Sequence, residues 1–316
     1  MLSCGFSATA TLKLRPITTN LPQRYPRMSA SVAPSDPTSS RAQPAAGSAF
    51  FLKHEFAIRR LHSLLGIVPL GLYMVVHLTA NASMLNGGET FQFVVYGIHA
   101  PGKLLPLIEW GAILLPLIFH AAIGVWISKT GHSNTDRYKF TNNRRYKWQR
   151  YSGVLALVYL FAHILHLHGW FHAHFWIDSI REVGLGQFRP YNAASTLAAA
   201  MQGYVWPAFY LVGMLACVYH LANGLWTAGI TWGLWISEAA QERATKVCVA
   251  LGLVLAVIGT SAWYGAVAPG EAEIAQFREA EDRMYDEAVR LGAIPDLPEK
   301  RSAPDNYSVG LAEDVQ

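Results

Sequence analysis

Five long apolar runs dominate the pattern of hydrophobic and polar positions along this chain. They cover, approximately, residues 61–81, 104–128, 151–170, 204–230 and 246–268. Each approaches the roughly 20 residues that a helix needs to cross a bilayer, and none shows the alternating segments of about ten residues that are typical of a membrane-spanning strand. The pattern predicts an all-α protein, an integral membrane bundle of five transmembrane helices.

The polar segments between the runs predict which side of the membrane each loop occupies. The segment 53–60, KHEFAIRR, is basic, and the loop 129–150 has seven lysines and arginines against one acid. Short basic loops stay in the cytoplasm. We therefore expect a cytoplasmic-membrane protein whose N-terminus and 129–150 loop are cytoplasmic. The loops 82–102 and 171–203 and, after five spans, the C-terminus are then outside.

Composition supports this prediction and excludes several classes of protein. The chain is 52% hydrophobic and 15% charged, whereas a soluble domain has about 25% charged residues. The net charge of +4 reflects the basic loops, so we interpret it as topology and not as nucleic-acid binding. Cys4, Cys217 and Cys248 lack the spacing of an iron–sulfur site. No glycine-rich nucleotide motif is present, so the chain has no recognisable flavin, nicotinamide or nucleotide site of its own.

The two ends of the chain differ from its apolar centre. Residues 1–48 are rich in Ser, Thr, Ala and Pro, which predicts a disordered extension. It is either a transit peptide or a non-native start, with translation beginning at Met28. The membrane domain then covers 49–268. The polar tail 269–316 has an apolar stripe along 271–291, which predicts a short amphipathic surface helix without a chemical role.

Four of the five runs carry a histidine well inside them, namely His77, His120, His163 and His220. An ionisable side chain within a membrane span is costly and therefore marks a functional site. With a rise of about 1.5 Å per residue along alternating spans, His77 and His163 fall in the outer half of the membrane and His120 and His220 in the inner half. Two layers of two histidines predict that the bundle encloses two b-type haems, each with one histidine on either side of the iron.

Two alternatives remain at this point. A single histidine in a span often serves only as a hydrogen-bonding partner between helices, although four at matched depths favour a cofactor. The third run also contains His166 and His168, of which His166 shares a helical face with His163. Depth favours His163, because His168 approaches the outer membrane surface.

Further polar residues near the span ends are candidates for proton exchange or for contacts to haem propionates. Glu109 lies near the start of the second run, where burial would suit its carboxyl to proton exchange. An ordinary interfacial glutamate is the alternative. At the inner end of the first run, arginine pairs well with carboxylates such as haem propionates, but the arginines there also satisfy the topology rule. The candidates there are Arg59, Arg60, His62 and Ser63.

Three segments carry a resemblance to a known family: RRLHSLLG at 59–66, PLIFHAAIG at 116–124 and YHLANGLW at 219–226. They resemble the cytochrome b anchor subunit of succinate:quinone oxidoreductase, in the five-helix, two-haem form of succinate dehydrogenase and fumarate reductase. The resemblance covers about 51–268. It implies that His120 and His220 ligate the inner haem and His77 and His163 the outer one. The register of Gln149 and Arg150 relative to His163 also matches, which favours His163 as the ligand from the third run.

The resemblance also implies a role and a set of partners. The chain would be an electron-transfer subunit of succinate dehydrogenase or fumarate reductase that does not itself act on succinate. Its partners would be a flavoprotein subunit, an iron–sulfur subunit, the lipid bilayer and a membrane quinone, which in this two-haem type is usually menaquinone. Glu109 would then exchange protons with the quinone at an outer site, and His62 and Ser63 would contact a propionate or the quinone. Two rival functions are a dihaem anchor of another quinone-linked dehydrogenase or hydrogenase, and a haem-free transporter with a histidine proton relay.

Overall fold

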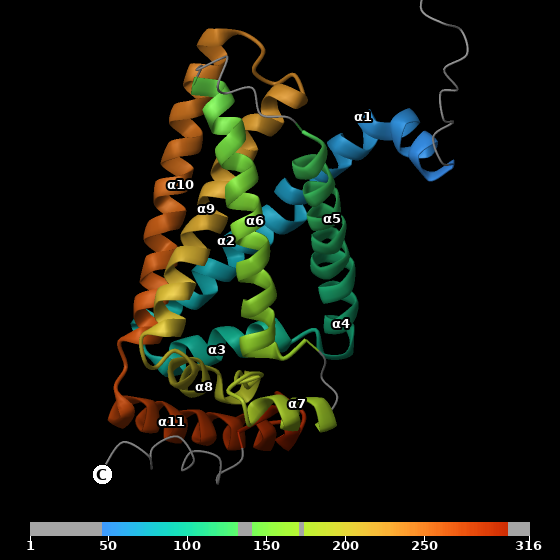
Figure 1. The fold of residues 1–316 in the computed structure, drawn as a ribbon. Coiled ribbons are helices and arrows are strands. Elements are labelled where there is room, and N and C mark those ends of the chain that lie inside the picture. Colours follow the sequence, from blue (N-terminus) through green and yellow to red (C-terminus); the bar gives the residue numbers. More distant parts are fainter. Residues whose placement is uncertain (1–45, 132–140, 171–173, 303–316) are drawn as a thin grey trace, which may run out of the picture. The chain divides into compact units, whose positions relative to one another are not determined.

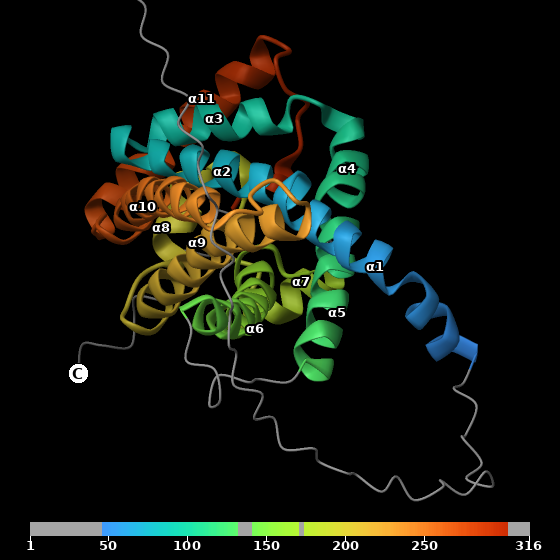
Figure 2. The ribbon, with the colours of Figure 1, turned by 90° about the horizontal axis from the view of Figure 1, so that it is seen from above.

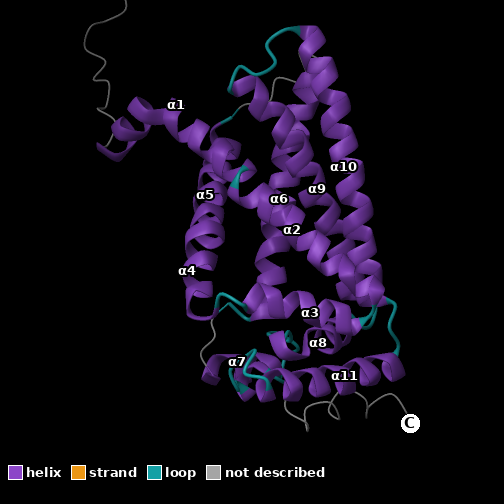
Figure 3. Cartoon of the chain, turned by 180° about the vertical axis from the view of Figure 1, so that it is seen from behind, coloured by secondary structure: helices purple, strands orange, loops and turns teal. Residues whose placement is uncertain are grey.

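A computed structural model describes residues 46–131, 141–170 and 174–302 of the chain. The predicted extension 1–48 therefore lies almost entirely outside the described residues. Within them all regular structure is helical (Figures 1 and 3). Five segments are long and apolar enough to cross a membrane, which confirms the predicted all-α membrane fold. These segments are Lys53–Asn86, Gly102–Thr130, Asn143–His168, Val205–Thr231 and Glu238–Val267.

The first span is broken in its middle by a proline. Helix α1 covers Ala46–Ile67 and α2 covers Pro69–Ala82, followed by the short 3-10 helix η1, Ser83–Asn86. Pro69 has no backbone N–H, and its ring disfavours a regular helix on its N-terminal side. The backbone N–H of Val68 still donates to Leu64 O at 2.9 Å, so the two helices continue as one span.

The second span is also irregular. The 3-10 helix η2, Gly102–Leu104, and helix α4, Leu105–Ile108, lead into a π-helical segment, η3, that covers Glu109–Leu114. Helix α5 then runs from Leu115 to Thr130. Pro116 cannot donate to the carbonyl one turn before it, and the wider π-helical turn precedes it directly. Such turns are frequent at functional sites, and this one begins at a residue singled out from the sequence.

The remaining spans are continuous helices. They are α6, Thr141–His168, α9, Val205–Thr231, and α10, Glu238–Val267. Two of them begin earlier than predicted. Helix α10 starts at Glu238 instead of near Lys246, with the Ser237 hydroxyl accepting from Ala240 N–H at its N-terminus. Helix α6 starts at Thr141, so the second half of the predicted 129–150 loop is helical.

The spans pack in the order α2, α10, α9, α6 and α5, and α5 returns to α2 (Figure 2). This order places α2 and α6 apart from each other, and likewise α5 and α9. Side chains from these separated helices therefore meet across the interior of the bundle. Part of the core is a cluster of buried apolar side chains, namely Leu78, Met214, Val218 and Leu255.

The predicted loops 82–102 and 171–203 contain helices, which the sequence analysis did not anticipate. Helix α3 covers Gly88–His99, α7 covers His174–Arg181, the 3-10 helix η4 covers Pro190–Asn192, and α8 covers Ala193–Ala200. In the tail, α11 covers Glu271–Arg290 where an amphipathic helix was expected, and η5 covers Pro298–Lys300. These elements, η5 aside, gather at one end of the bundle (Figure 1).

Helices α3, α8 and α11 pack against one another, and we call them the helical cap. Two fully buried polar side chains join them. Gln92 of α3 donates to Pro190 O and accepts from Ala193 N–H, both at 2.8 Å. The carboxylate of Glu281 in α11 accepts hydrogen bonds from the first turn of α8. The tail helix is thus attached to the membrane domain by specific buried contacts.

Candidate functional site

The four span histidines lie in two pairs inside the bundle. The ring centroids of His120 and His220 are 6.1 Å apart, with the ring planes at 82°. Those of His77 and His163 are 6.0 Å apart, with the planes at 86°. Each pair joins two helices that are not neighbours in the packing order. The structure therefore brings together the same side chains that the depth argument grouped. We call His120 and His220 the inner pair and His77 and His163 the outer pair.

His120 of the inner pair is held by the first span. Its Nδ1 lies 2.9 Å from the backbone oxygen of His62, and the two imidazole rings are stacked with centroids 4.0 Å apart. The ring also packs directly on Gly66, where a Cβ would overlap it. A carbonyl acceptor at Nδ1 favours the tautomer with the proton on that nitrogen. This leaves Nε2 with the free electron pair of a metal ligand.

His220 is held mainly by α6. Its Nδ1 lies 3.2 Å from three groups: the side-chain amide of Gln149, the backbone oxygen of Gln149 and the hydroxyl of Ser152. The amide of Gln149 also donates to His220 O at 3.0 Å. The ring packs on Gly153, where a Cβ would lie 2.8 Å from His220 Cε1. Both histidines of the inner pair thus rest on a glycine of another helix.

The outer pair has weaker polar partners. Nδ1 of His77 is 3.5 Å from Tyr73 Oη, and its Nε2 is 3.4 Å from the Asn81 amide. The Nδ1 of His163 is buried without a hydrogen-bond partner among the described residues. Around His163 the contacts are aromatic, with Tyr159 at 5.6 Å and Tyr210 at 5.5 Å between centroids. This pair is surrounded by aromatic rings instead of backbone carbonyls.

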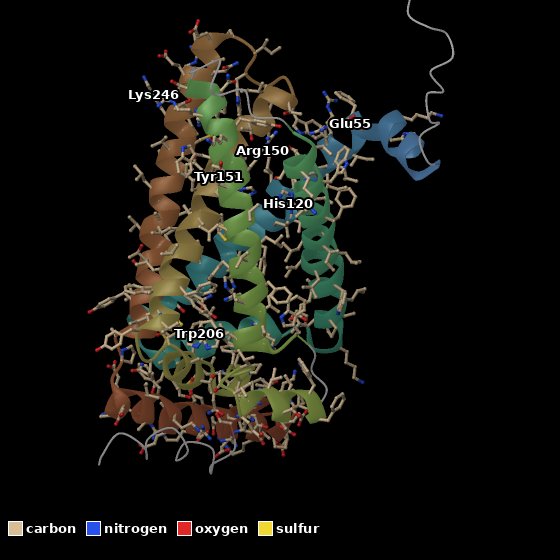
Figure 4. All side chains as sticks on the ribbon, viewed as in Figure 1. Glu55, His120, Arg150, Tyr151, Trp206 and Lys246 are labelled. Atoms are coloured by element: carbon tan, nitrogen blue, oxygen red, sulfur yellow. The ribbon has the colours of Figure 1, made fainter. Side chains whose placement is uncertain are left out.

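The neighbouring histidines of α6 point to other partners. His166 is buried, and its Nδ1 lies 2.9 Å from Tyr210 Oη. Its ring stacks on Trp206 at 3.7 Å, toward the end of the bundle where α8 lies (Figure 4). His168 is exposed. His163 is therefore the α6 histidine that faces His77, as depth and register had favoured.

The separation of the two imidazole rings in each pair suits a haem iron, whose remaining ligands belong to the haem and not to the protein. A metal–imidazole bond is about 2 Å long, and a ring centre lies about 1 Å beyond the bonded nitrogen, so two imidazoles on opposite sides of one metal have centroids about 6 Å apart. Both pairs have that separation. No group of three or more His, Cys, Asp or Glu side chains that could hold a metal ion occurs in the described part of the chain. Two protein ligands per site fit a haem better than a bare ion.

The predicted basic candidates at the start of the first span differ in their partners. Arg59 pairs with Glu55 at 2.8 Å, and Ser63 Oγ accepts from the indole N–H of Trp232 at 3.3 Å. Arg60 stacks on Phe56 and Trp232, but its Nε is buried without a partner among the described residues. Of this group, Arg60 therefore keeps a buried donor for an anion. The ring Nδ1 of His62 is likewise buried without a partner among the described residues, while the backbone oxygen of His62 contacts His120.

Arg150 is a further candidate that the sequence analysis used only for register. It extends from α6 and donates to Gly131 O at 2.9 Å. Its Nε, like that of Arg60, is buried without a partner in the described structure. Figure 4 shows Arg150 and His120 toward the same end of the bundle, opposite the helical cap. An unpaired buried guanidinium N–H is costly, and a carboxylate would satisfy it.

Glu109 begins the π-helical segment, which packs against α2. Its side chain is half-buried. Outside the spans, burial lowers the pKa of His99 in α3, and the Glu109 carboxylate acts in the opposite direction. The segment that Glu109 begins thus packs on the helix that carries His77. A groove of about 600 Å³ runs along the same span, lined by Leu65, Gly111, Leu115, Pro116, Ile118, Phe119 and Ala122.

Comparison with known proteins identifies the family of the chain. No family model matches the chain. The chain is 31% identical over 217 residues to a protein of Bacillus subtilis named succinate dehydrogenase cytochrome b558 subunit. The similarity covers 67% of this chain and 98% of the Bacillus protein, so it extends over essentially the whole relative. The chain is a multi-pass membrane protein that belongs to the family of succinate dehydrogenase cytochrome b subunits.

Proposed function

We propose that this chain passes electrons between an iron–sulfur subunit and a membrane quinone through two bis-histidine haems. The observation that carries the proposal is the pair of cross-bundle histidine contacts at 6.0 and 6.1 Å. A proton relay would need hydrogen-bonding distances between successive groups. Ring centroids 6 Å apart with perpendicular planes suit a metal between them better. The haems, when bound, supply one-electron chemistry.

The residues of the chain hold and orient the ligands. His120 and His220 would bind the inner iron and His77 and His163 the outer one. The His62 carbonyl keeps the Nδ1 proton of His120 in place, which directs Nε2 into the bundle. Such outer contacts orient metal ligands and raise their basicity. Gly66 and Gly153 admit the two inner rings close to the helix backbones.

Charged residues would serve the propionates and the quinone. Arg60 and Arg150, each with a buried unpartnered Nε, would bind carboxylates of the inner haem. Glu109 would exchange protons with a quinone beside the outer pair, since it begins a segment that packs on the helix of His77. The apolar groove along the same span would hold part of the quinone's hydrocarbon tail. Menaquinone is the species we propose.

Partners and orientation follow from family membership and charge. The chain would anchor a flavoprotein and an iron–sulfur subunit to the cytoplasmic membrane, without acting on succinate itself. By the positive-inside rule, the basic segments at 53–60 and 129–150 support an orientation with the N-terminus and the inner pair on the cytoplasmic side. The helical cap and the C-terminus would then lie outside.

The test is the reduced-minus-oxidised visible spectrum of the purified chain, with pyridine haemochrome quantification. We expect two b haems per chain. His163→Ala should remove one haem and His220→Ala the other, whereas the matched control His166→Ala should keep both. A folded preparation without haem would refute the proposal and favour the proton-relay transporter. Loss of a haem in the control, with His163→Ala unaffected, would reassign the α6 ligand.

A further inference from the structure

A chain of polar contacts runs from an arginine on α6 to the inner-pair histidine on α9, through two hydrogen bonds and an amide nitrogen that faces the histidine. Arg145 Nε donates to Asn223 Oδ1 at 3.0 Å, and Asn223 Nδ2 donates to Gln149 Oε1 at 2.7 Å. Gln149 Nε2 in turn lies 3.2 Å from Nδ1 of His220. Asn223 is buried and the other three side chains are half-buried. Each link joins α6 to α9.

Arg145 determines the orientation of both side-chain amides in this chain. A guanidinium group has N–H donors and no acceptor, so the amide oxygen of Asn223 must face it. The Asn223 amide nitrogen then faces Gln149, which must present its oxygen in return. As a result, Gln149 turns its N–H group, and not its carbonyl, toward His220.

Arg145 is itself held firmly in place. Its second nitrogen donates to Thr245 Oγ1 of α10 at 2.9 Å, and its guanidinium lies 3.8 Å above the ring of Trp226. The Trp226 indole N–H donates to Gln241 O at 3.1 Å. The arginine therefore connects α6, α9 and α10, and its orientation is not free to reverse.

The two inner-pair histidines consequently have different surroundings. Nδ1 of His120 faces a backbone carbonyl at 2.9 Å and no amide donor within the described contacts. Nδ1 of His220 has its acceptors only at 3.2 Å, the backbone oxygen of Gln149 and the hydroxyl of Ser152, and it also faces the amide nitrogen of Gln149, which cannot accept from it. A ligand whose N–H donates strongly is more basic and stabilises the oxidised metal. His220 is therefore the weaker electron donor of the two.

We propose that Arg145, acting through Asn223 and Gln149, is a positioning residue that raises the reduction potential of the haem ligated by His220. This inference rests on the proposed function. Two effects both raise this reduction potential. The fixed orientation of the Gln149 amide limits the basicity of His220, and the positive charge of Arg145 favours the reduced haem, which is the more negative state. Electrons arriving from an iron–sulfur subunit would thereby be retained on the inner haem.

The experiment is a redox titration of the two-haem protein, in which the wave missing from His220→Ala identifies the inner haem. In Arg145→Met we expect the equilibrium constant for reduction of that haem to fall about tenfold. This corresponds to a decrease of about 59 mV in its reduction potential for one electron. Arg144→Met, which removes the same charge from the neighbouring exposed position, should change it little. Arg145→Lys should retain most of the potential, because an ammonium group also only donates. The outer-haem wave should stay unchanged throughout.

Gln149→Glu tests the same inference without removing the arginine. Its carboxylate would accept from Nδ1–H of His220, so the inner-haem potential should fall again. An unchanged potential in this variant, with both haems bound, would overturn the inference whatever Arg145→Met does. An equal fall in Arg144→Met and Arg145→Met would also overturn it, because charge without orientation would then suffice. A wild-type chain without haem would instead refute the proposed function.

Discussion

The buried carboxyl of Glu281 makes the attachment of α11 dependent on pH. The side chain is fully buried in the helical cap and accepts hydrogen bonds from Ala194 N–H, Ser195 N–H and Ser195 Oγ–H. These donors favour the charged form, but burial outweighs them and raises the pKa of Glu281 to about 7. The group therefore binds a proton more tightly in the folded cap than in a detached, solvated tail.

The size and sign of the effect follow from this difference. The ordinary pKa is 4.5, and each factor of ten in proton affinity is worth about 1.36 kcal/mol. The docked cap is therefore stabilised by about 3 kcal/mol more at low pH than at high pH. Because the folded pKa is the raised one, this stability is fully present below about pH 4.5. It declines as the pH rises and is lost above about pH 7.

Hydrogen exchange of the α11 and α8 amides between pH 5 and pH 8, corrected for the intrinsic rate, measures the effect. Protection in both helices should decrease as the pH rises, while the interior of α9 stays protected. Glu281→Gln should abolish this dependence, because its amide stays neutral. Glu279→Gln is the matched control, since that side chain is 76% exposed. Equal protection at both pH values, or a pH dependence that survives in Glu281→Gln, would refute the reasoning.

Three further predictions concern the membrane interior. Gly153→Ala should remove the inner haem from the spectrum, because its Cβ would collide with the inner-pair histidine on α9, whereas Gly97→Ala, with open space around the new Cβ, should keep both haems. Glu109→Gln should slow quinone turnover severalfold with both haems intact, and normal turnover would exclude a proton role. Arg60→Gln should weaken retention of the inner haem on detergent washing, measured by haem content. Arg59→Gln should not, because that arginine already pairs within its own helix.

The five spans could be predicted because their signal is local. Each apolar run has the length that a bilayer requires, and no long-range contact is needed to recognise it. The grouping of the histidines was accessible for the same reason, since depth depends only on the distance along a helix. That the two pairs bind iron stays a prediction, but which side chains meet followed from counting residues along alternating spans.

Of the helical cap, only the tail helix α11 was expected from the sequence; α3 and α8 were not, because their stability is not local. Helix α3 and the eight-residue α8 are too short to be stable alone in water. They depend on partners far away in the sequence: Gln92 bonds to Pro190, and Glu281 bonds to Ala194. A polar residue outside the spans usually indicates a solvated segment. Only the folded structure shows that these two are fully buried.

The contacts of His220 were missed for a different reason, an error in one helix boundary. The third span was expected to start at Tyr151, which left Arg145 and Gln149 in a basic loop whose charge had a sufficient explanation in topology. Once α6 begins at Thr141, Arg145, Gln149 and Ser152 follow at spacings of four and three residues, along one helical face. Arg144 and Lys147 lie off this face and are exposed.

The positive-inside rule counts all these cations alike, so it cannot distinguish a charge that only orients the chain from one that contacts a ligand. Helical periodicity can, but only where the helix is known to exist. The boundary of α6 therefore decides whether Arg145 is read as a topological signal or as part of the site.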